Sequence, residues 1–492
     1  MTWSREERYR KYRDVSEKER MLLKKKVNAC PWRQSFHIQP PTGLLNDPNG
    51  FAYFNGEYHL FYQWFPHGPV HGLKHWYHVT STDMVNWQNK GLAIEPNEFY
   101  ESHGAFSGSG IVEQGDLYLF YTGNTRDEEW HRHPYQCMAK ITKENELVKA
   151  ACPIISSPPK GYTEHVRDPK VWKTGSLFYM IIGAQREDKI GCVLLYQSRD
   201  LKEWEFLGEV ITKLDAFGYM WECPDYIELD QKGILIFSPQ GIEAEGDLYN
   251  NIYQSGYLVG SPLNTSTKKF DHGPFQELDR GFDFYAPQTT LSKDGRRIMI
   301  GWMGLPEMNY PTDENGWAHC LTLPRELVLK DEKLIQRPVR ELASLRSNQE
   351  EVADQLLNER KSYPHIYGTT YELEVEFEVG TSDVVGIEFR SSENEKTIVH
   401  YNHLTKKITL DRSESGKEVG TAYGTKRAVG YDGESITFQL FVDVSSCEVF
   451  INDGDEVFTS RIFPSNCSTG IQFFAQGGQA SFQAKKWDLS MR

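Results

Sequence analysis

Leu45-Asn46-Asp47-Pro48-Asn49-Gly50 lies just before the apolar run Phe51-Ala52-Tyr53-Phe54 and places the carboxylate of Asp47 beside strong turn formers. Proline fixes φ, and asparagine or glycine accepts φ > 0, so the stretch alone also suits a surface hairpin. Two further acids have similar surroundings, Asp168 in Arg167-Asp168-Pro169 and Glu222 in Glu222-Cys223-Pro224. The fold and the function both depend on whether these three acids meet.

A pattern of glycine, apolar-aromatic strand and turn recurs five times from Asn46 onward. The strands follow Gly56, Gly115, Gly175, Gly233 and Gly295, roughly 60 residues apart, which is somewhat longer than the familiar propeller repeats. A second motif agrees with this period, because Ser81-Thr82-Asp83-Met84-Val85-Asn86-Trp87 returns as Ser198-Arg199-Asp200-Leu201-Lys202-Glu203-Trp204. Units of this kind predict four-stranded blades around a central channel, and hence a five-bladed β-propeller.

The three acids occupy equivalent places in this repeat. Asp47 precedes the first glycine-led strand, Asp168 the third and Glu222 the fourth. Phe106-Ser107-Gly108-Ser109 and Tyr285-Ala286-Pro287-Gln288 hold the same place in the second and fifth units. Equivalent positions of a radially repeated fold lie on one ring, so we expect the three carboxylates to converge on one axial pocket.

Four segments are expected, and together they make an all-β protein with a short N-terminal helix. Residues 1–30 are rich in Glu, Lys and Arg and predict a helical segment, whose role the sequence leaves open. Residues 31–335 form the propeller, and residues 336–360 form a helical linker, with the helix expected within 339–357. From Thr369 the apolar residues alternate as in a β-sandwich, so residues 361–492 are expected to form a sandwich with a structural role.

The composition excludes several classes of partner. A formal net charge of −15 disfavours nucleic acid and anionic membranes, whose recognition requires concentrated Lys and Arg. The first residues lack the apolar core of a signal peptide, and no stretch approaches the roughly 20 apolar residues of a membrane span, so we expect a cytoplasmic protein. Eight cysteines without CxxC spacing argue against a zinc site and a disulfide framework.

Two carboxyl groups across one glycosidic bond are the usual equipment for glycoside hydrolysis. Glu222 is flanked by Trp221 and Cys223, whose apolar character predicts a raised pKa and a role as acid/base. Asp47 lies among asparagines, whose amide groups are expected to keep it ionised as the nucleophile. Asp168 follows Arg167, so we expect an ion pair between them and a role in holding sugar hydroxyls. Each acid taken separately also suits a turn or surface position.

Taken together, these motifs resemble the glycoside hydrolase family of β-fructofuranosidases, which includes invertases, sucrose-6-phosphate hydrolases, levanases and inulinases. The resemblance covers nearly the whole chain from His37 and includes Tyr121-Thr122-Gly123-Asn124, Gly301-Trp302-Met303 and the stretch from Ser445 to Asn452. It implies a five-bladed propeller with a β-sandwich and a retaining double displacement through a covalent fructosyl-enzyme, with no metal or organic cofactor. In this resemblance Asp47 is the nucleophile and Glu222 the acid/base.

The resemblance also implies which side chains bind the sugar. Asp168 and Arg167 would orient the fructose hydroxyls. The other residues expected at the fructose are Asn46, Gln63, Trp76, Phe106, Ser107 and Tyr285.

The stretch His67-Gly68-Pro69-Val70-His71-Gly72-Leu73-Lys74-His75-Trp76 lacks the Trp-Gly-Asn usual in secreted invertases and resembles the intracellular enzymes that hydrolyse sucrose 6-phosphate. A phosphate on the glucose side would need cations. The candidates are His71, Lys74, His75, Arg132, His133 and Arg186. Each of them also suits a solvated surface position. His131 and His133 flank Arg132, but without a further ligand visible in the sequence a metal site is not expected.

Two other functions remain open on the sequence. The first is the same chemistry on free sucrose or short fructo-oligosaccharides, as in an invertase or exo-fructanase. The second is a non-catalytic sugar-binding propeller, against which the presence of all three acids speaks. The expected partner is a small sugar, and the chain is expected to be a monomer or a homodimer.

Overall fold

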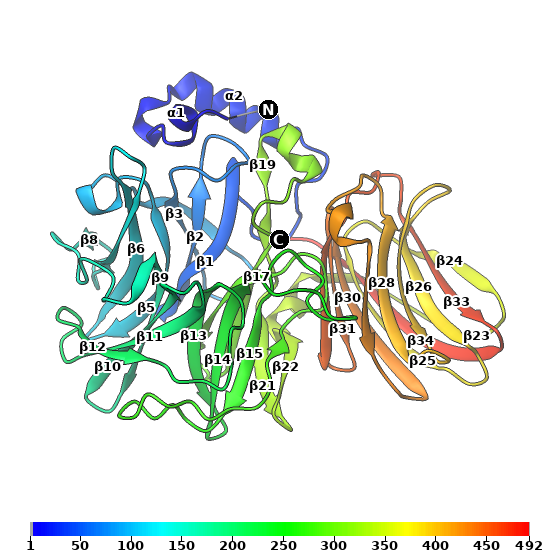
Figure 1. The fold of residues 1–492 in the computed structure, drawn as a ribbon. Coiled ribbons are helices and arrows are strands. Elements are labelled where there is room, and N and C mark those ends of the chain that lie inside the picture. Colours follow the sequence, from blue (N-terminus) through cyan, green and yellow to red (C-terminus); the bar gives the residue numbers. More distant parts are fainter. Residues whose placement is uncertain (1–2, 492) are drawn as a thin grey trace.

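The computed structural model describes residues 3–491 and shows two β domains side by side (Figure 1). Residues 1, 2 and 492, which belong to the first and last expected segments, lie outside the described residues. The larger domain is a propeller of five antiparallel sheets, and the smaller is a sandwich of two sheets. The expected all-β fold, with a five-bladed propeller and a C-terminal β-sandwich, is confirmed.

In each blade the strands follow one another in chain order. The first blade contains β1 (Gly43–Phe54), β2 (Glu57–Phe65), β3 (His75–Ser81) and β4 (Gln88–Ile94). The second contains β5 (Ala105–Glu113), β6 (Asp116–Arg126), β7 (Arg132–Ile141) and β8 (Leu147–Lys149). The third contains β9 (Tyr162–Thr174), β10 (Leu177–Arg186), β11 (Gly191–Ser198) and β12 (Glu205–Glu209). The fourth contains β13 (Met220–Leu229), β14 (Lys232–Gln240), β15 (Gly256–Gly260) and β16 (Gln276–Glu277). The fifth contains β17 (Tyr285–Leu291), β18 (Arg297–Met303), β21 (Arg325–Lys330) and β22 (Lys333–Pro338).

The first strands of the blades, β1, β5, β9, β13 and β17, contact one another in a closed ring around the axis. The segment between β18 and β21 joins the last blade to the first. Its strand β19 (Trp317–Ala318) pairs in parallel with the start of β1, and β20 (Cys320–Leu321) pairs with β18. Apolar side chains fill the space between neighbouring blades, as Phe61 and Trp76 of the first do against Leu119 and Tyr121 of the second.

Each inner strand is interrupted by a β-bulge at the place of a sequence motif. The register shifts fall at Leu45/Pro48 in β1, Ala105/Gly108 in β5, Arg167/Lys170 in β9, Glu222/Asp225 in β13 and Tyr285/Gln288 in β17. Asp168, Cys223 and Ala286, each directly before a proline, have φ of 71°, 48° and 47°. The motifs expected as turns therefore lie inside strands, because a bulge accepts the proline and turns the neighbouring side chains toward a new direction.

The sandwich consists of two six-stranded sheets. One sheet, in spatial order, contains β23 (Arg346–Leu357), β34 (Gln479–Leu489), β25 (Tyr371–Glu378), β30 (Ser435–Asp443), β31 (Ser446–Ile451) and β32 (Glu456–Arg461). The other contains β24 (Arg360–Tyr367), β33 (Gly470–Gln476), β26 (Val384–Ser391), β27 (Lys396–Asn402), β28 (Lys407–Glu414) and β29 (Lys426–Gly430). Their inner faces form one apolar core, in which Val375 and Phe377 pack with Val385 and Ile387.

The helix expected within residues 339–357 is wrong for most of its length. Only Arg340–Leu345 forms a short 3₁₀ helix, and residues 346–357 form the edge strand β23. In this strand Glu350 lies opposite Lys486 and Glu351 opposite Lys485 of β34. Opposite charges on neighbouring strands stabilise the pairing, and these partners are far away in the sequence. Four further 3₁₀ helices lie at Tyr12–Asp14, Phe99–Glu101, Pro311–Asn315 and Thr421–Tyr423.

The N-terminal segment forms α1 (Arg5–Arg8) and α2 (Glu17–Asn28), which lie over one end of the propeller (Figure 1). Ser4 and Ser16 begin them, each with a capping box that satisfies free N–H groups. At the end of α2, Val27 packs on Trp317 of β19. Within residues 3–491 no helix is long and apolar enough to cross a membrane.

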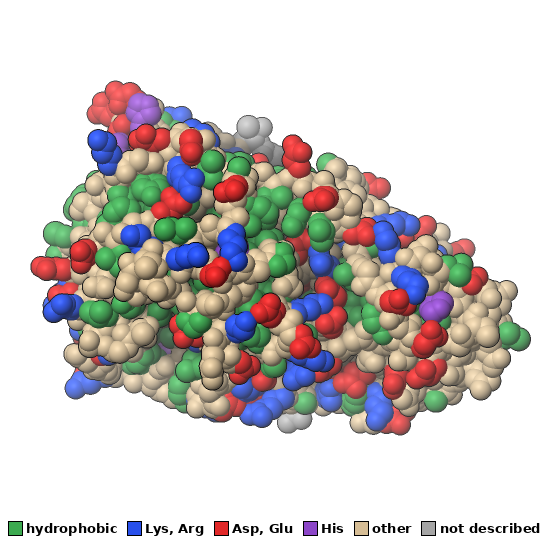
Figure 2. Space-filling model, turned by 60° about the horizontal axis from the view of Figure 1, so that its bottom comes forward, with side chains coloured by type: hydrophobic (Ala, Val, Ile, Leu, Met, Phe, Trp, Pro, Cys, Tyr) green, Lys and Arg blue, Asp and Glu red, His purple; other side chains and the backbone are tan. Residues whose placement is uncertain are grey.

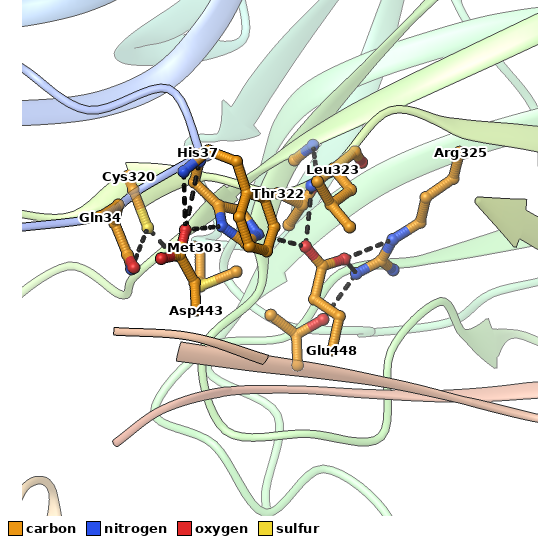
Figure 3. Close-up of polar contacts among 12 residues, drawn as sticks. Gln34, His37, Met303, Cys320, Thr322, Leu323, Arg325, Asp443 and Glu448 are labelled. Atoms are coloured by element: carbon orange, nitrogen blue, oxygen red, sulfur yellow. Dashed lines mark hydrogen bonds and ion pairs between the residues drawn. The ribbon is translucent and has the colours of Figure 1, made fainter. Parts of the chain in front are cut away.

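The two domains are joined through buried charges (Figure 3). His37 Nδ1 lies 2.8 Å from Asp443 Oδ2, and its Nε2 lies 3.0 Å from Glu448 Oε1. The other carboxylate oxygen of Glu448 accepts from Arg325 at 2.6 Å, and Arg325 also pairs with Asp279 at 3.0 Å. All five side chains are inaccessible to solvent or nearly so. Because a buried charge is costly without its partner, this network ties the sandwich to the propeller.

Basic and acidic side chains are interspersed over the face shown in Figure 2. No broad basic surface stands out on that face, which agrees with the net charge of −15. A basic site for an anionic ligand must therefore be local.

Candidate active site

A cavity of about 610 Å³ lies where the inner strands meet. Every blade contributes to its wall, through Asp47, Phe106, Arg167, Glu222 and Tyr285 in blade order. These are the equivalent positions of the five bulges, which turn the side chains toward the cavity. Of the three carboxylates expected in one axial pocket, Asp47 and Glu222 line this cavity.

Asp47 is held by a short chain of polar groups. Ser107 Oγ donates to its Oδ2, and Asn46 Nδ2 donates to its Oδ1 at 3.1 Å. Gln63 links these two neighbours, since its Nε2 donates to Ser107 at 2.6 Å and its Oε1 accepts from Asn46 at 2.7 Å. The second expected amide donor, Asn49, binds the Asp47 carbonyl oxygen instead (2.8 Å). Burial raises the pKa of Asp47, against the effect of the Ser107 hydrogen bond.

Asp168 lies directly behind the cavity wall and does not line it. Its Oδ2 accepts from the Cys223 backbone N–H at 3.0 Å. The Cys223 thiol lies 3.5 Å from Asp47 Oδ2 and 3.6 Å from Asp168 Oδ2, so the two carboxylates share it. Burial raises the pKa of Asp168 to about 7, although the nearby Arg167 opposes the shift.

Glu222 is surrounded by donors. Arg167 Nε and Gln240 Nε2 each donate at 2.8 Å, and the Tyr285 hydroxyl donates at 2.7 Å. The expectation that apolar neighbours enclose this carboxylate is wrong, because successive side chains of a strand point to opposite faces. Trp221 accordingly packs into the core between blades three and four.

The expected ion pair of Arg167 with Asp168 is also wrong. The guanidinium of Arg167 pairs with Glu222 instead, with its Nη2 2.7 Å from Glu222 Oε1. Its Nη1 lies 3.0 Å from His165 Nδ1. Arg167 and Asp168 are adjacent in β9, and the bulge directs them to different sides.

The structure brings most of the expected sugar-binding residues to the cavity. Asn46, Gln63, Phe106, Arg167 and Tyr285 line it. Trp76 and Ser107 lie behind the wall. The indole of Trp76 donates to the Phe106 carbonyl oxygen at 3.0 Å and so holds Phe106 in place, as Ser107 holds Asp47.

The expected phosphate ligands divide into two groups. His71, Lys74 and Arg132 line the cavity. The others do not: His75 is buried with its Nδ1 2.9 Å from the Leu73 carbonyl oxygen, Arg186 pairs with Glu209 at 2.9 Å, and His133 lies 3.2 Å from Asp127. Asp127 also contacts His131, so the two histidines have an acidic neighbour that was not expected, in an exposed loop.

Many residues of the wall were not expected from the sequence; the polar and charged ones include Arg8, Tyr9, Arg126, Gln240, Glu307 and His319. Arg126 ends β6 and Gln240 ends β14, the strands that follow Gly115 and Gly233, so extending the expected strands was a usable signal. Arg8 and Tyr9 carried no such signal, because the N-terminal segment reaches the cavity only through tertiary packing.

Comparison with known proteins agrees with the geometry. Residues 37–338 match the model of the glycosyl hydrolases family 32 N-terminal domain, and residues 341–488 match that of the family 32 C-terminal domain. The chain is 47% identical over 489 residues to a sucrose-6-phosphate hydrolase of Staphylococcus xylosus, covering 99% of this chain and 98% of the relative. A sucrose-6-phosphate hydrolase of Bacillus subtilis is 42% identical over 470 residues, covering 93% of each.

Solved structures give the same result. The structure of sucrose-6-phosphate hydrolase from Lactobacillus gasseri superposes with a TM-score of 0.93, at 38% identity and 99% coverage of both chains. A β-fructofuranosidase from Bombyx mori superposes with a TM-score of 0.81, at 33% identity, covering 97% of this chain and 99% of the other.

Proposed function

The chain belongs to glycosyl hydrolase family 32, and from this membership we propose that it hydrolyses sucrose 6-phosphate to fructose and glucose 6-phosphate, with sucrose as a second substrate. Full-length relatives with 38–47% identity carry the name sucrose-6-phosphate hydrolase, and this likeness supports the phosphorylated substrate. The observation that carries the chemistry is the meeting of Asp47 and Glu222 in one cavity of about 610 Å³.

We assign the double displacement to these two acids. Asp47, aligned by Ser107 and Asn46, attacks the anomeric carbon of fructose, while Glu222 donates a proton to the departing glycosidic oxygen. Glu222 then takes a proton from water, which attacks the fructosyl-enzyme and restores Asp47. A retaining mechanism of this kind predicts carboxyl groups about 5 to 5.5 Å apart. The hydrogen bonds from Gln240 and Tyr285 orient Glu222 for both steps.

Asp168 is assigned to the fructose hydroxyls together with Arg167. Its carboxylate lies beside that of Asp47, since both contact the Cys223 thiol, at 3.6 Å and 3.5 Å.

Arg132 is the strongest of the expected phosphate ligands. His71 is a poor cation, since burial and the neighbouring Lys74 hold its pKa well below the ordinary value. Lys74 donates to the Asn46 side chain at 2.5 Å, and burial lowers its pKa to about 7. Burial lowers the pKa of Arg132 as well, to about 9, so its guanidinium stays charged at neutral pH.

The organisation of the protein completes the proposal. The propeller, whose last strand β22 ends at Pro338, is assigned the catalysis, and the sandwich, whose strands run from β23 at Arg346 to β34 at Leu489, is assigned a supporting role. We place the enzyme in the cytoplasm, as a monomer or homodimer, because a charged sugar phosphate does not cross a bilayer unaided. The partner is the sugar substrate, and the assigned steps use protein side chains alone.

Steady-state kinetics with both substrates test the function. We expect kcat/KM to be higher for sucrose 6-phosphate than for sucrose, and Asp47→Asn to lower kcat by at least about a thousandfold. Asp215→Asn is the matched control, since Asp215 is exposed and does not line the cavity. An active Asp47→Asn variant would refute the mechanism. Equal or lower kcat/KM for sucrose 6-phosphate would favour the invertase alternative, and an inactive wild-type protein the sugar-binding one.

A further inference from the structure

The N-terminal segment places the cationic side chain of Arg8 at the wall of the cavity. Arg8 ends α1, and its carbonyl oxygen accepts from the Leu73 N–H at 2.7 Å, while its guanidinium donates to the His71 carbonyl oxygen at 3.2 Å. A Cβ at Gly72 would lie 2.4 Å from the Arg8 carbonyl oxygen, so the approach requires glycine there. These contacts fix Arg8 at the wall of the cavity that also contains Glu222.

Two further arginines come from the end of the β6–β7 hairpin. Arg126 and Arg132 are direct cross-strand partners, so their side chains leave the sheet on the same face, and both line the cavity. Like charges directly opposite one another destabilise a sheet. Arg126 donates to the Trp130 carbonyl oxygen at 3.1 Å, and Arg132 lies over the ring of Phe106 at 5.6 Å.

Trp130 packs the hairpin against the N-terminal segment. The guanidinium of Arg5 lies over its ring at 3.9 Å and that of Arg126 at 5.7 Å. Tyr9, the residue after Arg8, packs edge-on against the same ring with the centroids 5.3 Å apart. Arg8, Arg126 and Arg132, three of the arginines that line the cavity, are therefore held in one packed unit rather than on separate mobile loops.

The charge of this unit has no internal counter-charge. Among residues 3–491, no carboxylate oxygen lies within 4.0 Å of a guanidinium nitrogen of Arg8, Arg126 or Arg132, although the chain carries a surplus of acids. The Nε of Arg126 is buried without a hydrogen-bond partner. Burial, with Arg167 and Arg126 nearby, lowers the pKa of Arg132 to about 9, so an anion bound there would favour its charged form.

We propose that Arg8, Arg126 and Arg132 together bind the phosphate group of the substrate, so that the N-terminal segment completes the site. This inference rests on the proposed function and specifies which residues bind the phosphate group of the proposed substrate. Glu222 protonates the oxygen that leaves with glucose, and Arg132 lies near Glu222, so the phosphate of the glucose unit reaches this side of the cavity. Guanidinium groups suit this role because they bind phosphate oxygens through two parallel hydrogen bonds.

The test compares kcat/KM for sucrose 6-phosphate with kcat/KM for sucrose in Arg8→Gln, Arg126→Gln and Arg132→Gln. Loss of one charged hydrogen-bonding partner should lower the ratio on the order of ten- to a hundredfold in each variant. Arg8→Lys should recover part of the ratio, since it keeps the charge. Arg10→Gln is the matched control from the same segment, because Arg10 pairs with Glu19 and does not line this cavity.

Inhibition by glucose 6-phosphate supplies a second readout. Its inhibition constant should rise in Arg8→Gln by a factor similar to the loss in the kinetic ratio, while inhibition by fructose stays as in the wild-type protein. A folding defect would change both inhibitors and both substrates together.

The outcomes separate the two proposals. If the wild-type protein prefers sucrose 6-phosphate and Arg8→Gln keeps that preference, this inference fails and the proposed function stands. If the wild-type protein has no such preference, both fail. An equal loss with both substrates in Arg8→Gln would assign Arg8 a structural role and overturn the inference.

Discussion

Arg167 contacts one carboxylate oxygen of Glu222 through two nitrogens, Nε at 2.8 Å and Nη2 at 2.7 Å. The arginine belongs to the third blade and the acid to the fourth, so the contact forms only when the inner strands close their ring. It leaves Asp168 without the ion pair that its sequence neighbour suggested. Arg167 therefore positions Glu222, the proposed proton donor.

Replacing Arg167 by lysine should lower kcat/KM on the order of a hundredfold for sucrose and sucrose 6-phosphate alike, because an ammonium group cannot reproduce the two-nitrogen contact with Glu222. Steady-state kinetics with both substrates provide the measurement, and Arg199→Lys, at an exposed position, is the control. A loss confined to sucrose 6-phosphate would instead place Arg167 in the phosphate site.

Asp168→Asn should flatten the pH dependence of stability. Burial raises the pKa of Asp168 to about 7, above its ordinary 3.8, so the folded protein binds this proton more tightly than the unfolded chain. The contribution of Asp168 to the free energy of unfolding therefore falls as pH rises from about 4 to 7. Urea denaturation at pH 5 and pH 8 should show a smaller decrease in the variant than in the wild-type protein. Identical decreases would show that Asp168 is ionised at both pH values.

His37→Gln should remove a stabilisation that disappears at high pH. Burial opposes protonation of His37, but its bonds to Asp443 and Glu448 outweigh it and raise the pKa to about 9. The contribution is complete below pH 6.5 and is lost as pH rises through 9, with a size of about 3 kcal/mol at 1.36 kcal/mol for each unit of pKa shift.

Chemical denaturation between pH 6 and pH 9.5 measures this contribution. The wild-type protein should lose more stability over the range than His37→Gln, whereas the exposed His365→Gln control should follow the wild-type protein. A parallel decline in all three proteins would exclude His37 as the titrating group.

Cysteine labelling should show that Cys223, in the bulge of β13, is buried. Cys152 and Cys467 are exposed, whereas Cys223 is buried. Burial and the carboxylates of Asp168 and Asp47 raise the pKa of the Cys223 thiol well above its ordinary value, so it is a poor nucleophile. Mass spectrometry after brief treatment of the folded protein with iodoacetamide should find adducts on the two exposed cysteines. Early modification of Cys223 would contradict the packed arrangement.

Added salt should lower kcat/KM for sucrose 6-phosphate more steeply than for sucrose, because screening weakens the attraction between a phosphate and the cationic wall. The comparison requires initial rates at low substrate concentration across a range of NaCl. In Arg132→Gln the difference in slope should shrink. Equal slopes for the two substrates in the wild-type protein would show that recognition of the phosphate is not electrostatic.

Local patterns in the sequence were sufficient to predict the domain architecture of the protein. The glycine-led strands and the repeated Ser-to-Trp motif predict five blades because turn chemistry and strand alternation act over a few residues. Asp47 and Glu222 occupy equivalent positions in their repeats, and a radially repeated fold places such positions on one ring. The β-sandwich follows in the same way from alternating apolar residues.

Tertiary structure alone decided which groups touch. The bulges direct Arg167 to Glu222 and place Asp168 beside Cys223, and residues 346–357 form a strand because they pair along their length with β34. The segment of Arg8 reaches the hairpin of Arg126 because Arg5 and Tyr9 pack on Trp130. The physical reason is common to these cases: each contact joins residues far apart in the chain, and its geometry depends on strand register and bulge direction, which no local pattern specifies.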